Sequence, residues 1–318
     1  MKQAPEWLPD RIRDRLDSHR INRALRGVLR TRPYEAAPPE QADAELNMLL
    51  CKRDLLLGLV ALKSLLRFRE LKLSVTLVDD GSLSRPDREQ IDAHIPGTRW
   101  QPRRSDGPEI AELLAGFPRL SELYFQSSFL FVTKLLHPLI LSRTERVIQC
   151  DSDAAFFRRP IRLIEFCKGN DLRPLYLHDH QDESSAVPTE VHVALAELEA
   201  SIAEPGRQWQ VGHRFFNAGL LIYRRDHLDL AIAESYLAWR QKLPPARQEG
   251  KLGIWFGPWT IEQTCYLTMY SLGKASPEPL GDDYWIGGGE GHVFNHFLRH
   301  YVVQVETLRQ LSRLIEEF

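Results

Sequence analysis

Short apolar runs alternate with stretches of helical spacing along residues 46–242. Apolar or β-branched runs bounded by polar turns are typical of buried strands. Such runs occur at Leu46–Cys51, Lys72–Val78, Arg146–Cys150 and Ala218–Tyr223. Helices are predicted between and after these runs, at Leu55–Phe68, 86–94, Ser127–Leu141 and 226–242. This order of strands and helices predicts an open α/β sheet.

The first 40 residues differ from the rest of the chain. Residues 1–32 contain nine Lys or Arg and four Asp or Glu, a local charge of +5. One helical face would carry the apolar positions Ile12, Leu16, Leu25 and Leu29. Prolines at 32–39 indicate a linker. We predict a basic helical arm and linker at 1–40 and one domain at 41–318. The arm either packs on that domain or contacts an anionic membrane surface or a partner.

Composition and charge argue against several classes of function. The 318 residues include 41 basic and 43 acidic ones, so the net charge of -2 argues against a nucleic-acid partner. The longest uncharged apolar run, Leu55–Leu62, is far shorter than a membrane-spanning helix. No two cysteines form a C-x-x-C pair, which favours buried reduced thiols and a cytoplasmic protein. The cysteines are Cys51, Cys150, Cys167 and Cys265.

Two acidic clusters each follow a predicted strand directly. Asp79 and Asp80 end one strand, and Asp151 and Asp153 end another. Ligands of open α/β sheets bind outside the carboxyl ends of the strands, and a bare buried carboxylate is costly. A turn after the strand would bring Asp151 and Asp153 toward one cation. Carboxylate oxygens suit Mg²⁺ or Mn²⁺, so this cluster predicts a divalent metal site.

At these residues the sequence resembles the GT-A-fold glycosyltransferases that use nucleotide sugars, most closely glycosyltransferase family 8 and its relatives. Val147–Asp153 resembles their DxD strand, and Val78–Ser82 resembles their strand-end motif for the nucleoside. Lys134 resembles the lysine that precedes the DxD motif. Phe216–Leu220 resembles their Phe-Asn-x-Gly strand, and Glu262-Gln263 resembles their later Asp-Gln pair.

The resemblance implies a fold and an activity. The fold would be a single GT-A-like domain with a mixed, mostly parallel sheet and helices on both faces, preceded by the arm. Residues 41–153 would form its nucleotide-binding half, and residues 154–318 its acceptor half and C-terminal region. The activity would be metal-dependent transfer of a sugar from a nucleoside-diphosphate sugar, with UDP favoured, to a glycan or glycolipid hydroxyl. Bacterial glycan or polysaccharide synthesis, retention of configuration and, through the basic arm, contact with the inner face of the membrane are further expectations.

The resemblance also implies roles for single residues. Asp151 and Asp153 would hold Mn²⁺ or Mg²⁺. The donor nucleotide would contact Asp79, Asp80, Lys134, Asp151 and Ser152. The anomeric centre would be surrounded by Asn217, Glu262 and Gln263. An inverting enzyme would instead need a carboxylate base, for which Glu262 and Asp179 are candidates.

The C-terminal part departs from the family pattern. Glu262 stands where relatives commonly have Asp, and their His-x-x-Gly-x-x-Lys motif is not intact. His292, His296 and His300 stand there four residues apart, so on a helix they would share one face. Three alternatives stay open: His296 completes the divalent site, the three histidines bind zinc, or they are core or surface residues. Arg299 is a candidate replacement for the missing lysine.

Other segments have candidate roles in sugar binding. The aromatic segment Gly253–Trp259 could stack on sugars or fill the core. Gly287–Gly291 is a candidate lid, and His178–His180 either lines the acceptor side or forms a polar turn. Two other functions are alternatives to a glycosyltransferase: a phosphatase of the haloacid dehalogenase class, which also begins with Asp-x-Asp after a strand, and a non-catalytic sugar-nucleotide-binding or scaffold protein.

Overall fold

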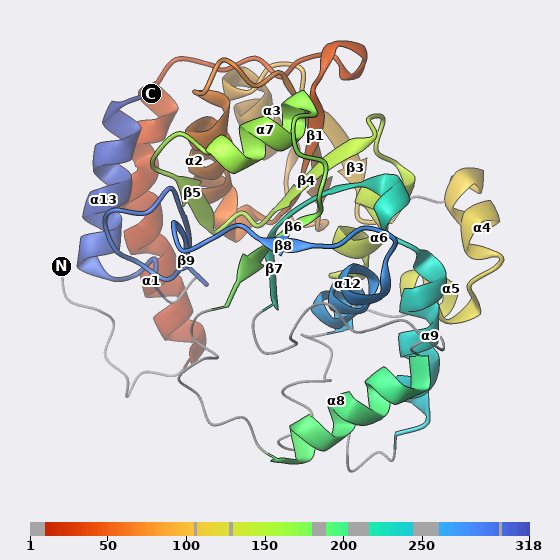
Figure 1. Cartoon of the computed structure of the whole chain (residues 1–318). Helices are drawn as coiled ribbons and strands as arrows, with labels where there is room; N and C mark the ends of the chain where they lie inside the picture. Colours follow the sequence, from red (N-terminus) through yellow and green to blue (C-terminus); the bar gives the residue numbers. More distant parts are fainter. Residues whose placement is uncertain are drawn as a thin grey trace.

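The computed structural model describes residues 10–104, 107–126, 130–179, 189–202, 216–243, 261–298 and 301–318 (Figure 1). Within these residues the centre is a seven-stranded sheet in the order β3-β2-β1-β4-β7-β6-β8. Its strands are β1 (Ala44–Leu50), β2 (Leu73–Asp79), β3 (Arg99–Pro102), β4 (Arg146–Cys150), β6 (Leu175–His178), β7 (Phe216–Arg224) and β8 (Glu278–Pro279).

The sheet is mixed and mostly parallel, as expected. Strand β1 lies between β2 and β4 and is parallel to both, and β3 is parallel to β2. Strand β7 is antiparallel to β4 on one side and to β6 on the other. The four predicted strands are all present, with ends shifted by no more than a few residues. The carboxyl ends of β1, β2 and β4 therefore meet at one edge of the sheet.

Helices cover both faces, which confirms the predicted fold class. One face shares a hydrophobic cluster with α1 (Asp10–Leu25), α2 (Leu55–Leu66), α3 (Arg85–His94), α7 (Ile161–Lys168) and α13 (Val305–Glu316). The other packs on α4 (Pro108–Leu114), α5 (Pro118–Phe125), α6 (Val132–Ile140), α8 (Thr189–Ile202), α9 (Leu230–Gln241) and α12 (Ile261–Leu272). Because side chains alternate along a strand, Ile148 of β4 faces the first group and Val147 the second.

Two predicted helices differ from the observed ones. Helix α9 begins at Leu230, because a 3₁₀ turn at Arg225–His227 follows β7 and Asp229 caps the helix. Helix α6 covers the second half of the predicted Ser127–Leu141 and contains Pro138. Residues 127–129 lie outside the described part of the chain. Further 3₁₀ turns occupy Arg26–Arg30, Pro39–Gln41 and Lys52–Asp54.

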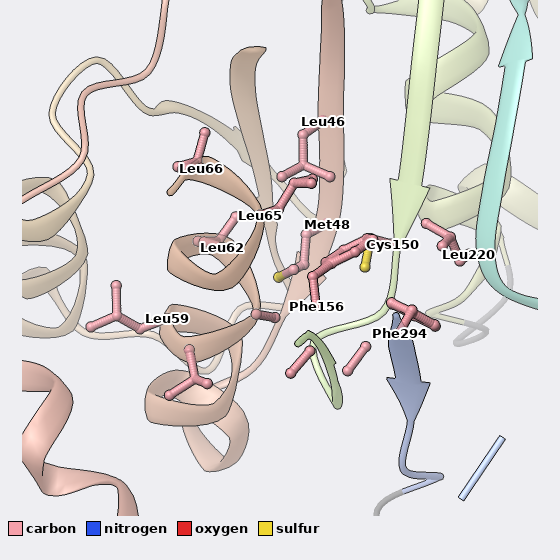
Figure 2. Packing of buried hydrophobic residues seen from close by; sticks show 14 of the residues in the cluster. Leu46, Met48, Leu59, Leu62, Leu65, Leu66, Cys150, Phe156, Leu220 and Phe294 are labelled. Carbon is pink, nitrogen blue, oxygen red and sulfur yellow. The ribbon is translucent and has the colours of Figure 1, made fainter. Parts of the chain in front are cut away.

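A small second sheet lies beside the end of β4. It consists of β5 (Ala154–Phe156), β10 (Phe294–His296) and β9 (Tyr284–Ile286), with β10 in the middle. Phe156 and Phe294 pack with their ring centroids 4.8 Å apart. Figure 2 shows these rings beside Met48 of β1, Cys150 of β4 and the leucines of α2. The core therefore fixes the segments on either side of the Asp151–Asp153 turn.

The N-terminal arm packs on the domain. Figure 1 shows α1 alongside α13, so the first and last described helices lie together. Ile21 and Leu25 of α1 are buried in the same cluster as the apolar residues of α13. The following stretch is also attached, since the backbone N–H of Tyr34 donates to His94 O at 3.0 Å and that of Ala36 to Pro96 O at 2.8 Å. The buried side of the arm thus faces protein.

Among the helices in the described ranges, none is both long and apolar enough to cross a membrane.

Candidate metal and donor site

The Asp151–Asp153 turn lies at the carboxyl end of β4, in the middle of the main sheet. The backbone N–H of Asp151 donates to Gly219 O on β7 at 2.9 Å, and Phe297 N–H donates to Asp153 O at 2.8 Å. The turn is therefore held from two sides, by β7 and by the segment that follows β10. Both carboxylates keep partial exposure, 26% for Asp151 and 20% for Asp153.

Asp151, Asp153 and His296 form a cluster that could hold a metal ion. The Nε2 atom of His296 lies 3.3 Å from Asp153 Oδ1 and 3.5 Å from Asp151 Oδ2. One ligand atom from each residue lies within 4.8 Å of the others. Two carboxylate oxygens and one imidazole nitrogen are a donor set that suits Mn²⁺ or Mg²⁺. The residues present therefore fit the divalent site that the DxD resemblance implies.

His296 reaches this cluster from a strand. His296 does not lie on a helix, because Phe294–His296 pair with β5 and β9 as β10. His296 is buried, whereas His292 stacks on Trp285 with the ring centroids 5.2 Å apart. His300 and Arg299 lie outside the described residues. Burial opposes a charge on His296, but the carboxylates of Asp153 and Asp151 outweigh it and raise its pKa.

Lys134 connects the DxD turn to α12. Its Nζ lies 2.7 Å from Asp151 Oδ1 and 3.2 Å from Glu262 Oε1, and both Lys134 and Glu262 are buried. Burial raises the pKa of Glu262 to about 7, although Lys134 opposes this shift. Burial alone would lower the pKa of Lys134, but Asp151 and Glu262 raise it. Asp151 thus uses one oxygen for the lysine and turns the other toward His296.

Two further contacts hold Lys134 and Glu262 in place. The hydroxyl of Tyr266, one turn after Glu262 in α12, donates to Lys134 O at 2.9 Å. The neighbouring Gln263 accepts a hydrogen bond from Ala218 N–H of β7 at 3.3 Å. Helix α12 therefore contacts both α6 and β7 at the site. Sequence reasoning missed Tyr266, for which a buried aromatic position in a helix is no specific signal.

Asn217 points at His296. Its Oδ1 lies 3.1 Å from His296 Nδ1 and accepts the backbone N–H of Gly219 at 2.8 Å. The sequence prediction placed Asn217 at the anomeric centre and did not foresee this contact. Gly219 was also not predicted to matter for geometry. A glycine inside a buried strand is the signal that could have found it, because such a residue often marks a close approach.

Asp79 and Asp80 lie at the end of β2, which β1 separates from β4. Asp79 accepts the N–H groups of Gly81 at 2.7 Å and Leu83 at 3.3 Å, and it pairs with Arg88. Asp80 Oδ1 accepts Ser82 N–H at 2.8 Å. These carboxylates therefore shape the loop at the same sheet edge but are not part of the metal cluster.

The other residues with predicted roles lie outside the metal cluster or outside the described residues. Ser152 packs beside Gly58 of α2, where an added Cβ on the glycine would lie 3.5 Å from Ser152 Cβ. The candidate lid is attached, since Gly289 O accepts the amides of Asn295 at 2.8 Å and Gln310 at 2.9 Å. His178 ends β6 and Asp179 follows it. The segment Gly253–Trp259 and His180 lie outside the described residues.

No protein-family model and no curated protein matches this chain. Among solved structures, it is similar to mouse xyloside xylosyltransferase 1, with 15% identity, TM-score 0.45, and 85% of this chain and 99% of that chain covered. It is also similar to the galactosyltransferase LgtC in complex with donor and acceptor sugar analogs, with 12% identity, TM-score 0.47, and coverage of 86% and 96%.

A third similar structure is core-mannan synthase A from Aspergillus fumigatus in its Mn/GDP form. Its identity is 12%, its TM-score is 0.36, and 78% of this chain and 72% of that chain are covered. At these low identities and TM-scores, the function proposed below rests on the site and the motifs.

Proposed function

We propose that this protein is a divalent-metal-dependent glycosyltransferase that moves a sugar from a nucleoside-diphosphate sugar to an acceptor hydroxyl. The observation that carries the proposal is the cluster of Asp151, Asp153 and His296 at the carboxyl end of β4. This edge is where open α/β sheets bind their ligands. Partly exposed carboxylates beside a buried imidazole leave ligand atoms that a cation from solvent can reach.

The residues around this cluster would have different roles. Asp151, Asp153 and His296 would hold Mn²⁺ or Mg²⁺, which supplies positive charge for the departing diphosphate when bound. Lys134 fixes the orientation of Asp151 and adds a second positive charge beside the turn. Glu262, Gln263 and Ser152 lie around the same edge and would contact the donor. Asp79 and Asp80 shape the loop at the end of β2 where the nucleoside would bind.

The finer parts of the proposal rest on the family resemblance. We favour a UDP-sugar donor, a glycan or glycolipid acceptor in bacterial surface-glycan synthesis, and retention of configuration. Retention agrees with the surroundings of Glu262, because a buried carboxyl that pairs with Lys134 is poorly placed to reach an acceptor hydroxyl as a base.

A donor-hydrolysis and transfer assay tests the proposal. The full chain is incubated with Mn²⁺ and a panel of UDP-, GDP- and CDP-sugars, and release of the nucleoside diphosphate is measured. We expect turnover with one base, loss of turnover with EDTA, and its recovery when Mn²⁺ is added back. Asp153→Ala should lower turnover by about 100-fold or more, because several kcal/mol of charge stabilisation are lost.

The matched control is Asp226→Ala, which removes an exposed carboxylate at the opposite end of β7 and should leave turnover unchanged. Retained turnover in Asp153→Ala would contradict the site assignment. Binding of a nucleotide sugar without turnover would favour a non-catalytic sugar-nucleotide-binding protein. Release of phosphate from phosphomonoesters would favour the phosphatase alternative.

A further inference from the structure

The amide of Asn217 has only one orientation that satisfies its neighbours. The backbone N–H of Gly219 points at one terminal atom of this side chain at 2.8 Å. An N–H can donate only to an acceptor, so that atom is the carbonyl oxygen Oδ1 and not the NH₂ group. Asn217 is buried on β7, which keeps the side chain in this position.

This orientation determines which nitrogen of His296 carries the proton. The Nδ1 atom of His296 lies 3.1 Å from the same Oδ1. Because that oxygen has no proton to give, Nδ1 must be the donor. In a neutral imidazole the other nitrogen, Nε2, then has a free electron pair. That electron pair faces Asp151 and Asp153, where a metal ligand is needed.

Gly219 makes room for the imidazole in this position. A Cβ on Gly219 would lie 2.2 Å from Nδ1 and 2.3 Å from Cε1 of His296. These distances are far below van der Waals contact, so any side chain at position 219 would displace the ring. Two alternate residues of β7 therefore position His296. Asn217 contacts it through its side chain, and Gly219 leaves space for the ring because it has no side chain.

We propose that Asn217 and Gly219 are positioning residues for the metal ligand His296. Gly219 leaves the space for the imidazole against β7, and Asn217 holds the tautomer that presents Nε2 to the cation. The inference rests on the proposed function, in which Asp151, Asp153 and His296 bind a divalent ion. It gives Asn217 the role of hydrogen-bond partner to His296 Nδ1, the nitrogen that faces away from the cation, and not a place at the anomeric centre of the donor sugar.

Mn²⁺ binding provides the first test, because it can be measured without catalysis by following the signal of free Mn²⁺ in electron paramagnetic resonance. Asn217→Ala should weaken Mn²⁺ binding by about 10–100-fold, the usual effect of removing the hydrogen-bond partner of a ligating histidine. Gly219→Ala should also weaken it. Asn217→Asp keeps an acceptor at the same place and should retain most of the affinity.

The matched control is Asn295→Ala. Asn295 is buried, like Asn217, and adjoins His296 in β10, but its amide donates to Gly289 O on the other side of the strand. This variant should lower the melting temperature and leave Mn²⁺ affinity unchanged. Parallel loss of affinity in Asn295→Ala and Asn217→Ala would overturn the inference, because a general loss of stability would then explain both.

A second measurement uses the unaltered protein, so it does not depend on a variant folding. Nitrogen-15 NMR of histidine-labelled protein loaded with Mg²⁺ reports the tautomer of each imidazole, and His296→Gln identifies the signal. We expect the proton of His296 on Nδ1, and a proton on Nε2 would overturn the inference.

The two proposals fail separately. If Asp153→Ala kept its Mn²⁺ affinity, the assignment of the metal site itself would be overturned. Loss of affinity in Asp153→Ala with full affinity in Asn217→Ala would keep the metal site and overturn only the positioning role.

Discussion

At the scale of single residues, Lys63 of α2 is a buried charged group outside the site. Its side chain is fully buried, and its ammonium donates to Thr31 Oγ1 at 2.7 Å and to Arg32 O. Within the described part of the chain, no carboxylate forms an ion pair with it. Burial, with a smaller effect from Arg32, lowers the pKa of Lys63 to about 8. The lysine thus attaches the linker after the arm to α2 at an electrostatic cost.

This cost predicts a pH dependence of stability. In the unfolded chain Lys63 keeps its ordinary pKa near 10.5, so between about pH 8 and pH 10 the unfolded state binds more protons than the folded state. The free energy of unfolding contributed by Lys63 therefore rises across this window. Urea unfolding of the wild type and Lys63→Met at pH 7.5 and pH 9.5 would measure it.

We expect wild type to gain stability relative to Lys63→Met as the pH rises between these two values. A constant difference would mean that Lys63 has an ordinary pKa in the folded protein.

The candidate site shows which residues a sequence can identify. Asp151, Asp153 and Lys134 are predictable because their motifs place them at the end of β4 or shortly before it. His296 is one of three evenly spaced histidines, and nothing in that spacing indicates a strand. The contact between Asn217 and His296 joins residues 79 positions apart, so it depends on how β7 and β10 are placed by the whole core.

At the scale of elements, the short strands β5 and β10 carry the site. Strand β5 starts directly after Asp153, and β10 ends at His296. Their pairing places His296 opposite Ala154. The packed rings of Phe156 and Phe294, tilted by 57° to each other, join this pair of strands to the core on α2 (Figure 2). Packing of two apolar rings therefore sets the distance between the carboxylates and the imidazole.

Phe294→Ala tests this dependence. Removing the ring should lower the free energy of unfolding by about 3–5 kcal/mol, because it leaves a cavity in a packed core. It should also weaken Mn²⁺ binding, since His296 lies two residues further along β10. Phe294→Leu is the control and should retain most of both properties. Unchanged Mn²⁺ affinity in folded Phe294→Ala would show that β10 does not need this anchor.

Some strands could be predicted from the pattern of apolar residues, and others could not. The four main strands were predictable because each is a run of apolar residues between polar turns. Strands β5, β9 and β10 have three residues each, which is too short for any period to appear. They form only because the surrounding core holds them next to one another. The main sheet therefore follows from local sequence, whereas the small sheet follows from tertiary packing.

At the scale of the whole molecule, helix α1 of the arm packs against α13, the last helix. Helix α1 packs on α13 and α2, and its Leu25 is fully buried. Leu16 on the same helix remains 44% exposed. The arm is therefore a structural part of the protein, with its arginines Arg23, Arg26 and Arg30 on the exposed side.

Leu25→Ala and Leu16→Ala form a matched pair for this contact. Leu25→Ala should lower the free energy of unfolding by about 2–5 kcal/mol. Leu16→Ala should change it by no more than about 0.5 kcal/mol, as is usual for exposed positions. Denaturant unfolding of both variants checks the expectation. A small effect of Leu25→Ala would mean that the arm leaves the domain readily in solution.

The separation of the proposed metal ligands along the chain has a consequence for assembly. A growing chain exposes Asp151 and Asp153 long before it has made residue 296, so an early fragment would have two ligands and lack the third. An ion that binds only the complete set stabilises only the folded state. It would then link the middle of the chain to its last part in the folded state alone, and the stability that it adds would depend on the concentration of the free ion. Chelation would be expected to loosen β10 first.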